Sequence, residues 1–210
     1  MYISNEDILK MDTRYRAAFI NSICGFKSAS LIGTMDSSEK TNLAIFSSVI
    51  HLGSNPALIG FINRPDSTNR HTLENILATK CYTINHINQN IYQKSHQTSA
   101  RYPKDISEFD ATGLTIEYST AINAPYVKEC NIKYGLEFAE SYKLEINGTI
   151  LVIGKIVEII LPENCLYTDG TIDIEKAGTI TLSGLDSYHS TQQIARLSYA
   201  KTDKIPELLT

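Results

Sequence analysis

The chain has 210 residues, of which 42% are hydrophobic and 20% are charged, as in an ordinary single globular domain. Its formal net charge of −4 argues against general nucleic-acid binding, which requires a basic face. No segment reaches the ~20 consecutive apolar residues of a membrane span, and residues 1–16 lack the basic and apolar regions of a signal peptide. We therefore expect a cytoplasmic protein with no membrane or nucleic-acid partner.

The first part of the chain predicts a helix followed by short strands. Residues 4–23 carry apolar side chains at helical spacing, with Ser4 and Asp7 as a capping pair and Gly25 beyond the end. Short apolar segments bounded by turn residues predict four strands, over residues 29–35, 42–49, 57–62 and 81–87. Before the last of these, the sequence HTLENILAT predicts a short helix with Thr72 as its N-cap.

Residues 88–112 are polar and weakly helical, and they are long for a plain connection, which favours a functional segment. Residues 142–161 predict a hairpin around Asn147-Gly148 with a nearly all-apolar second strand, which we expect to be central in its sheet. In the first strand, Tyr142, Leu144 and Ile146 alternate with polar residues, a pattern typical of a half-buried strand.

Two further short strands are predicted at residues 171–174 and 179–182. Six or more mostly antiparallel strands with few helices predict a mainly β protein, in which a closed barrel carries peripheral helices. We expect a single domain over residues 1–210. Its predicted parts are an N-terminal helical segment, core strands with a polar loop, an insertion, and the remaining strands with a tail (1–27, 28–87, 88–112 and 113–210).

Several familiar motifs are absent from the sequence. No GxGxxG follows a strand and no GxxxxGK[ST] occurs, which disfavours dinucleotide-binding and P-loop folds of the common kinds. The four cysteines and five histidines show no CxxC or HExxH spacing, so no metal site is predicted and the cysteines are expected to be reduced thiols.

One polar loop gathers groups that suit a phosphate. Arg64 follows a predicted strand, and Arg70, His71 and Thr72 stand where a helix begins. The first turn of a helix offers free N–H groups and a positive field, and arginine adds a fork of donors. Glu74 in the same turn opposes an anion unless it points away. The alternative is a solvated turn with ordinary surface charges, and both interpretations stay open at this point.

A pair of serines interrupts the apolar strand NLAIFSSV. Alternation places Asn42, Ala44 and Phe46 on one face, and Leu43, Ile45 and Ser47 on the other. Buried polar side chains need hydrogen-bond partners, so Asn42, Ser47 and Ser48 suit the polar edge of a planar heterocycle. Equally open is the interpretation that these side chains satisfy backbone groups at a bend.

The run LIGTMDSSEKTNLAIFSSVIHLGSNPALIGFINRPDSTNRHTLENI resembles the flavin reductase-like family of FMN-binding split barrels. That family's pattern is a strand ending in Thr, an NxAxxS strand, a PPL turn, an apolar strand and a phosphate loop with R-x-T and N-I. Here the turn reads Ser54-Asn55-Pro56-Ala57-Leu58, with one proline in place of two. The likeness continues through CYTINHI and, less closely, through residues 142–161 and the tail. The segment HQTSARYP at 96–103 is similar to a flavoredoxin-like subgroup.

The resemblance implies an antiparallel split β-barrel of the FMN-binding type, with FMN as the cofactor. It implies contacts to the isoalloxazine ring and ribityl chain from six residues: Thr34, Asn42, Leu43, Ala44, Ser47 and Ser48. It implies phosphate contacts from Arg64, Arg70, His71 and Thr72. Further candidates for the ring or its dimer-facing side are Asn85, His96, Thr98, Ser99 and Ala100.

The resemblance also implies a function, NAD(P)H-dependent flavin reduction, in which electrons pass from the flavin to an unidentified acceptor. A protein is one candidate for that acceptor. No catalytic side chain is expected, because flavin N5 takes the hydride. A homodimer is implied, since the family's flavin sites lie near a subunit interface. Some members carry a GDH-like motif with a histidine near the nicotinamide, which ILVIGKIVEI lacks. An FMN-binding electron carrier or flavin store is therefore the alternative, and a split barrel binding pyridoxal phosphate or haem is a third.

Overall fold

The structure, a computed structural model, describes residues 1–65 and 71–209. The described helices are α1 (Asn5–Lys10), α2 (Thr13–Ile23), α3 (His71–Thr79), α4 (Tyr92–Gln97), α5 (Glu108–Thr112) and the 3-10 turn η1 (Glu163–Cys165). The longer strands are β2 (Ser30–Met35), β3 (Thr41–Phe46), β4 (Ile50–Ser54), β5 (Ala57–Asn63), β6 (Cys81–His86), β9 (Lys133–Lys143) and β10 (Ile150–Ile160). The short strands are β1 (Lys27–Ser28), β7 (Ile116–Glu117), β8 (Tyr126–Val127), β11 (Thr181–Ser183), β12 (Ser187–His189), β13 (Arg196–Leu197) and β14 (Leu208–Leu209).

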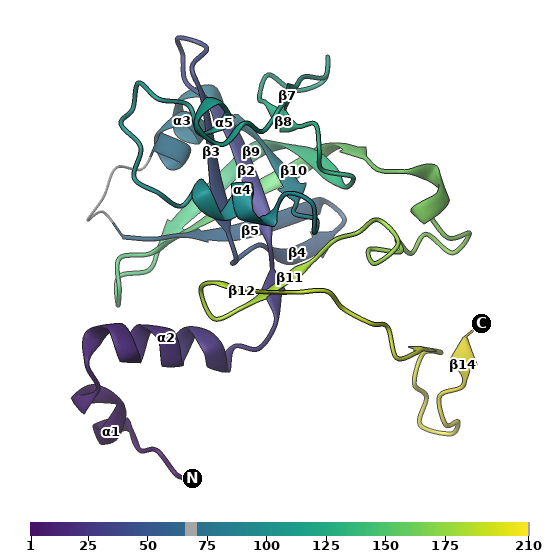
Figure 1. The fold of residues 1–210 in the computed structure, drawn as a ribbon. Coiled ribbons are helices and arrows are strands. Elements are labelled where there is room, and N and C mark those ends of the chain that lie inside the picture. The colour runs from purple at the N-terminus through teal and green to yellow at the C-terminus, as the bar shows by residue number, and fades with distance from the viewer. Residues whose placement is uncertain (66–70, 210) are drawn as a thin grey trace.

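The seven longer strands form one antiparallel sheet in the order β3-β2-β6-β9-β10-β5-β4 (Figure 1). In a flat sheet, the outer two strands would lie roughly 29 Å apart, because neighbouring strands are about 4.8 Å apart. Yet β3 and β4 are joined through residues 47–49 alone, which span at most roughly 14 Å. The sheet must therefore curl into a barrel, as the antiparallel strand pattern predicted.

Alternation along the strands divides the core between the two faces of this curved sheet. Ile32, Phe61 and Tyr82 belong to one buried cluster inside the barrel, which Phe46 joins. Leu31 and Leu43 point the other way, into a second cluster with residues of the insertion and of β11. The predicted alternation in β3 is thus confirmed, because Phe46 and Leu43 pack into different clusters.

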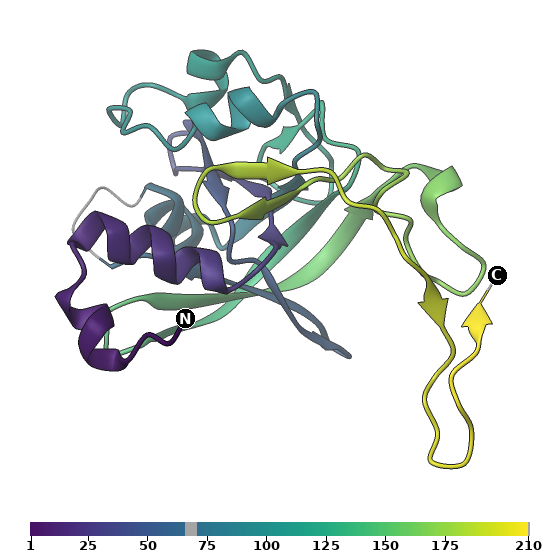
Figure 2. The same ribbon diagram turned by 60° about the horizontal axis from the view of Figure 1, so that its bottom comes forward.

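The predicted helix over residues 4–23 is wrong in one respect: the chain forms two helices, separated at Met11 and Asp12. The predicted capping pair is confirmed, since the Ser4 hydroxyl and the Asp7 carboxylate satisfy each other's backbone N–H groups. A second cap causes the break, because the Asp12 carboxylate accepts from the backbone N–H groups of Arg14 and Tyr15. Neither helix has a buried residue, and both project from the barrel (Figures 1 and 2).

The strand predictions are confirmed for the barrel core with shifted ends. The segment predicted as a strand over 42–49 ends at Phe46, and a separate strand, β4, follows. The β9–β10 hairpin turns at the predicted Asn147-Gly148, and β10 is central, between β9 and β5. The hairpin tip is not half-buried as predicted: Ile146 is 93% exposed, because β9 and β10 extend beyond the barrel there.

The remaining differences concern the second half. The predicted strand at 171–174 is absent from the described structure, in which Ile172 makes only an isolated bridge to Leu166. The strand predicted at 179–182 is present as β11, over Thr181–Ser183. The predicted insertion at 88–112 contains α4 and α5, and both helices contact β3. The insertion therefore lies along an outer edge of the sheet.

The last residues of the chain also leave the barrel. A two-stranded hairpin of β13 and β14 projects below the barrel in Figure 1, as α1 and α2 do, and Figure 2 shows that the hairpin and these helices lie on opposite sides of the molecule. At the base of this hairpin, Arg196 donates a hydrogen bond to Asp169. The Arg196 guanidinium also lies over the ring of Tyr167. None of the helices in residues 1–65 and 71–209 combines the length and apolar character that a bilayer crossing requires.

Candidate functional site

Four buried polar side chains meet where β2, β3 and α3 come together; we call this group the polar corner. Asn42 Nδ2 donates to Thr34 Oγ1 (3.3 Å) and to Thr72 Oγ1 (3.0 Å). Asn75 Nδ2 donates to the same Thr34 Oγ1 at 3.1 Å. Thr34 and Asn42 stand opposite each other in the β2–β3 register, so their side chains share one face. Three of the four were predicted from the sequence, and the structure brings these three together.

Helix α3 supplies the other wall of the polar corner. The sequence predicted Thr72 as the N-cap of this helix. That prediction is wrong, because in the described structure the helix begins at His71 and Thr72 is its second residue. The first-turn N–H groups of a helix have no partner within the helix. Arg64 is exposed just after β5. The predicted phosphate ligand Arg70 lies outside the described residues.

Glu74, which opposes an anion in the first turn of α3, has a cationic neighbour. Its carboxylate lies 3.6 Å from Lys104 Nζ, and both side chains are mostly exposed. The sequence analysis noted that Glu74 opposes an anion in this turn unless it points away. In the structure the Glu74 carboxylate is directed to Lys104, so its repulsion of a phosphate is reduced. No sequence pattern indicated Lys104, which lies 30 positions away along the chain.

A buried carboxylate holds the outer edge of β3. Glu108 Oε2 accepts a hydrogen bond from Leu43 N at 2.9 Å, and both residues are buried. Burial raises the pKa of Glu108, while the Leu43 N–H and the nearby His71 act in the opposite direction. Leu43 itself is fully enclosed in the outer cluster, so its backbone N–H and its side chain are both engaged within the protein.

The serine pair lies in the connection between β3 and β4. The Ser48 hydroxyl donates to Ile62 O and accepts from Ile62 N, both at 3.1 Å. The hydroxyl thereby satisfies backbone groups of β5 that no neighbouring strand satisfies at this point. This confirms, for Ser48, the interpretation that the serines satisfy backbone groups at a bend. Ser47 and Ala44 are half-buried.

The two weaker groups of candidates lie away from the polar corner. Asn85 is fully buried; its Nδ2 donates to Leu31 O (3.2 Å), and its Oδ1 accepts from Val127 N (2.9 Å). Asn85 pairs with Leu31 in the register, three residues from Thr34, which corresponds to about 10 Å along a strand. Its amide therefore ties backbone segments together.

The His96–Ala100 segment ends α4. The ring of His96 is exposed, and its Nδ1 lies 2.9 Å from Tyr188 Oη of β12. Thr98 is buried and donates to Ser95 O, whereas Ser99 and Ala100 are exposed. These contacts connect the insertion to β12, and His96 remains exposed.

The donor set at the polar corner suits a phosphate ester. It combines the Thr72 hydroxyl with the helix-start N–H groups of α3, and His71 and Arg64 are close by in sequence. Sequence analysis missed Asn75, Glu108 and Lys104. Asn75 was present in the N-I pair of the family pattern, whereas only the folded insertion brings Glu108 and Lys104 to this place. Within the described residues, no cluster of three or more histidine, cysteine or acidic side chains is arranged to hold a metal.

Comparison with known proteins gives this geometry a family. Residues 26–175 match the family described as flavin reductase like domain. A protein from Shewanella frigidimarina NCIMB 400, classed as a flavin reductase with a split barrel domain, is 55% identical, with a TM-score of 0.92 over 95% of this chain and 100% of that one. Nitrilotriacetate monooxygenase component B from Bacillus cereus is similar in fold, at 20% identity and a TM-score of 0.82 over 94% and 98% of the two chains. Flavoredoxin of Desulfovibrio vulgaris (Miyazaki F) aligns with a TM-score of 0.69 at 22% identity, over 85% and 92%.

The curled antiparallel sheet, with a polar corner beside a helix start, defines a split barrel of the kind found in flavin-linked oxidoreductases. The chain belongs to the flavin reductase-like family. The resemblance noted in the sequence is thereby confirmed.

Proposed function

We propose that this protein is an FMN-binding oxidoreductase that takes reducing equivalents from NAD(P)H and passes them to a small molecule or a protein acceptor. The observation that carries this proposal is the polar corner, where Thr34, Asn42 and Thr72 are fixed by hydrogen bonds beside the start of α3. Membership in the flavin reductase-like family supports a flavin as the occupant.

Each element at the site has a role in binding. The Thr72 hydroxyl and the first-turn N–H groups of α3 bind the phosphate. Arg64 and, by the sequence prediction, Arg70 add positive charge, and the His71 ring adds a nitrogen within the same turn. The inward face of β3, around Asn42 and Ala44, supports the ring. Bound flavin supplies the hydride and electron chemistry. The chain's own contribution is orientation and access, so no side chain is assigned as an acid or a base.

A visible spectrum of the purified protein, taken before and after anaerobic addition of NADH or NADPH, tests this function. We expect the absorption of an oxidised flavin that bleaches with one of the two donors. A spectrum of pyridoxal phosphate or haem, or no chromophore after incubation with excess FMN, would refute FMN binding. Persistent oxidised absorption with both donors would refute the reductase assignment alone.

The phosphate contact can be tested separately. Arg70→Ala should weaken FMN binding by ~1–3 kcal/mol, as expected when a charge-assisted hydrogen bond is lost. Arg14→Ala, an exposed change of the same charge on α2, should leave the affinity unchanged. Equal FMN affinities for wild type and Arg70→Ala in a fluorescence titration would show that the phosphate loop is misassigned.

A second function is favoured by one feature of β10. This strand, ILVIGKIVEII, contains no histidine where some family members carry one near the nicotinamide. An electron carrier or flavin store would bind FMN and accept electrons from dithionite or a partner protein, with negligible turnover of NADH or NADPH. The anaerobic spectrum therefore separates the two functions.

We also propose a homodimer, because this chain exposes more surface than a compact monomer. A monomer of 23.4 kDa is expected to expose about 9,700 Å², whereas this chain exposes 13060 Å². The excess of about 3,300 Å² is larger than the roughly 1,000–2,500 Å² that each subunit buries in a large permanent interface. The projecting elements carry exposed apolar side chains, among them Leu9, Ile23, Tyr199 and Leu208.

Sedimentation equilibrium tests the dimer. The wild-type chain should sediment as about twice 23.4 kDa, and Leu9→Glu with Ile23→Glu should shift it toward the monomer, because a buried unpaired charge is costly. A wild-type monomer at micromolar concentration would refute the proposal. For the compartment, we propose the cytoplasm, supported by the four cysteines, which are all free thiols in the structure.

A further inference from the structure

A short part of the insertion is fastened across β3 to α3; we call it the 104–108 clip. The Ser107 hydroxyl lies 2.8 Å from Thr41 Oγ1 at the start of β3. The next residue, Glu108, binds Leu43 N. These two contacts fix Ser107 and Glu108 on the strand that carries Asn42 of the polar corner, three and four residues after Lys104.

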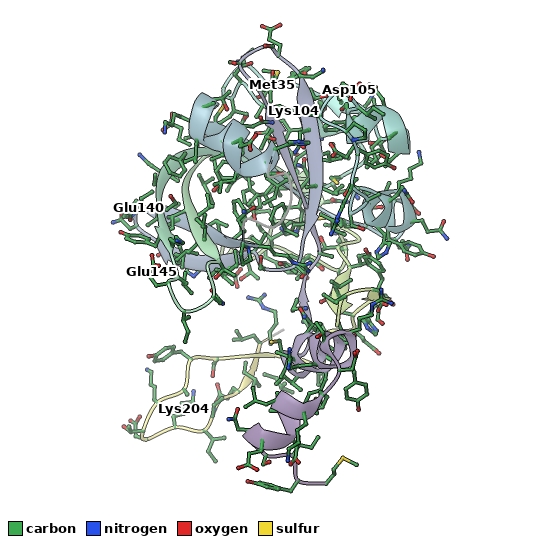
Figure 3. All side chains as sticks on the ribbon, turned by 90° about the vertical axis from the view of Figure 1, so that its left-hand side faces the viewer. Met35, Lys104, Asp105, Glu140, Glu145 and Lys204 are labelled. Carbon is green, nitrogen blue, oxygen red and sulfur yellow. The ribbon has the colours of Figure 1, made fainter. Side chains whose placement is uncertain are left out.

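Lys104 lies among carboxylates at this end of the barrel. Its Nζ lies 3.6 Å from Glu74 Oε2 in the first turn of α3. It also helps, after the Lys40 N–H and the Ser38 N–H, to lower the pKa of Asp36. Figure 3 shows Lys104 at the same end of the barrel as Met35, the last residue of β2, which follows Thr34 in the chain. The Lys104 ammonium group thus pairs with Glu74 and also influences Asp36, which follows the last residue of β2.

The sign of this arrangement matters for an anionic ligand. A carboxylate in the first turn of a helix is favourable by itself, because it faces the positive end of the helix dipole. The same carboxylate repels a phosphate dianion that uses the same turn. A lysine paired with the carboxylate holds it directed toward Lys104, which keeps it from turning toward a phosphate on that turn, and adds no hydrogen-bond donor to the polar corner itself.

We propose that Lys104 is a specificity-determining residue: by holding the Glu74 carboxylate in an ion pair, it allows the polar corner to bind a flavin that carries a phosphate in preference to one that lacks it. This inference rests on the proposed function, since it takes the phosphate of FMN as the ligand group. Lys104 acts through Glu74, and it does not contact the ligand.

Dissociation constants for FMN and riboflavin, measured by fluorescence titration, test the inference in four proteins: wild type, Lys104→Ala, Glu74→Gln and the double variant. Lys104→Ala should weaken FMN binding about two- to fivefold, the range of an exposed ion pair, and leave riboflavin unchanged. Glu74→Gln should tighten FMN binding by a similar factor. In the Glu74→Gln background, Lys104→Ala should change the FMN affinity by less than about 1.5-fold.

Lys128→Ala is the matched control, because Lys128 is exposed and the substitution removes the same charge. Its FMN affinity should equal that of wild type at about 0.15 M salt, where distant surface charges are screened. An effect of Lys104→Ala that persists in full without Glu74 would overturn the inference, as would no effect or equal losses for FMN and riboflavin. Wild-type protein that binds riboflavin as tightly as FMN would instead refute the phosphate site in the proposed function, before any variant is compared.

Discussion

A tyrosine hydroxyl inside the barrel provides a sharp test of the packing. Tyr82 is fully buried, and among the described residues its Oη has no hydrogen-bond partner. Burial raises its pKa, so the hydroxyl stays neutral. A buried polar group without a partner costs about 1–3 kcal/mol. Tyr82→Phe is therefore expected to leave the free energy of unfolding unchanged or to raise it by up to about that amount.

The same hydroxyl limits its neighbour on β10. A Cβ at Gly154 would lie 2.2 Å from Tyr82 Oη and 2.8 Å from Cζ. Tyr82 has little room to withdraw, because its ring packs edge-on against Phe61 at 5.7 Å. Gly154→Ala should thus cost about 1–3 kcal/mol, the usual range for overpacking. In the Tyr82→Phe background the nearest contact is removed, and the cost should fall by about 1 kcal/mol.

Urea denaturation at one protein concentration measures the unfolding free energies of wild type, Tyr82→Phe, Gly154→Ala and the double variant. Tyr126→Phe is the control, because the Tyr126 hydroxyl donates to Glu158 Oε1 at 2.7 Å and its loss should destabilise the protein by about 1–3 kcal/mol. If Tyr82→Phe destabilises as much as Tyr126→Phe does, the Tyr82 hydroxyl has a partner and the reasoning is wrong. Strict additivity of Tyr82→Phe and Gly154→Ala would refute the contact between them.

Three further outcomes can be measured by the same unfolding assay, and the third also needs the ligand titration. Desolvation lowers the pKa of His86 to about 4, so its contribution to stability is present above pH 6.5 and is lost as the pH falls toward 4, at about 1.4 kcal/mol per pH unit. His86→Gln should flatten this pH dependence of the unfolding free energy, and an unchanged slope would contradict the reasoning. Because the pKa of Glu108 is raised, its ionisation weakens the fold as the pH rises. Glu108→Gln at pH 7 should keep the bond to Leu43 N with no loss of stability, whereas Glu108→Ala should lose about 1–3 kcal/mol; equal losses would contradict this. Asn42→Ala should lower the free energy of unfolding by about 1–3 kcal/mol, because Thr34 and Thr72 each lose a hydrogen-bond donor. If this variant loses less affinity for FMN than for riboflavin, the polar corner is not the phosphate site.

The sequence predicted those parts of the fold in which local pattern and tertiary setting agree. The strands of the barrel core have apolar runs between turn residues, and Asn147-Gly148 sets the β9–β10 turn. The break between α1 and α2 was missed although Asp12 is a good N-cap, because the apolar spacing continues across it. The exposure of Ile146 could not be read from alternation, since alternation reports which face a residue takes and not whether anything covers that face.

At the candidate site, the predictable residues are those tied to local geometry. Thr34, Asn42 and Thr72 lie at strand and helix positions that a familiar pattern fixes. Glu108 and Lys104 reach the site only because the insertion folds back over β3, and no local pattern encodes that path. The Ser48 hydroxyl satisfies Ile62 because the barrel opens there, which depends on the register of a strand pair far along the chain.

The covering of β3 by the insertion also bears on solubility. An outer strand with free backbone N–H and C=O groups is a template on which another chain can stack and grow an aggregate. The Glu108 carboxylate occupies one such N–H, and α5 lies against the strand. The opposite border is guarded differently, since β4 is short and has an irregularity between His51 and Gly53. Deleting the insertion would therefore remove a guard against fibrous self-association, whatever it did to cofactor binding.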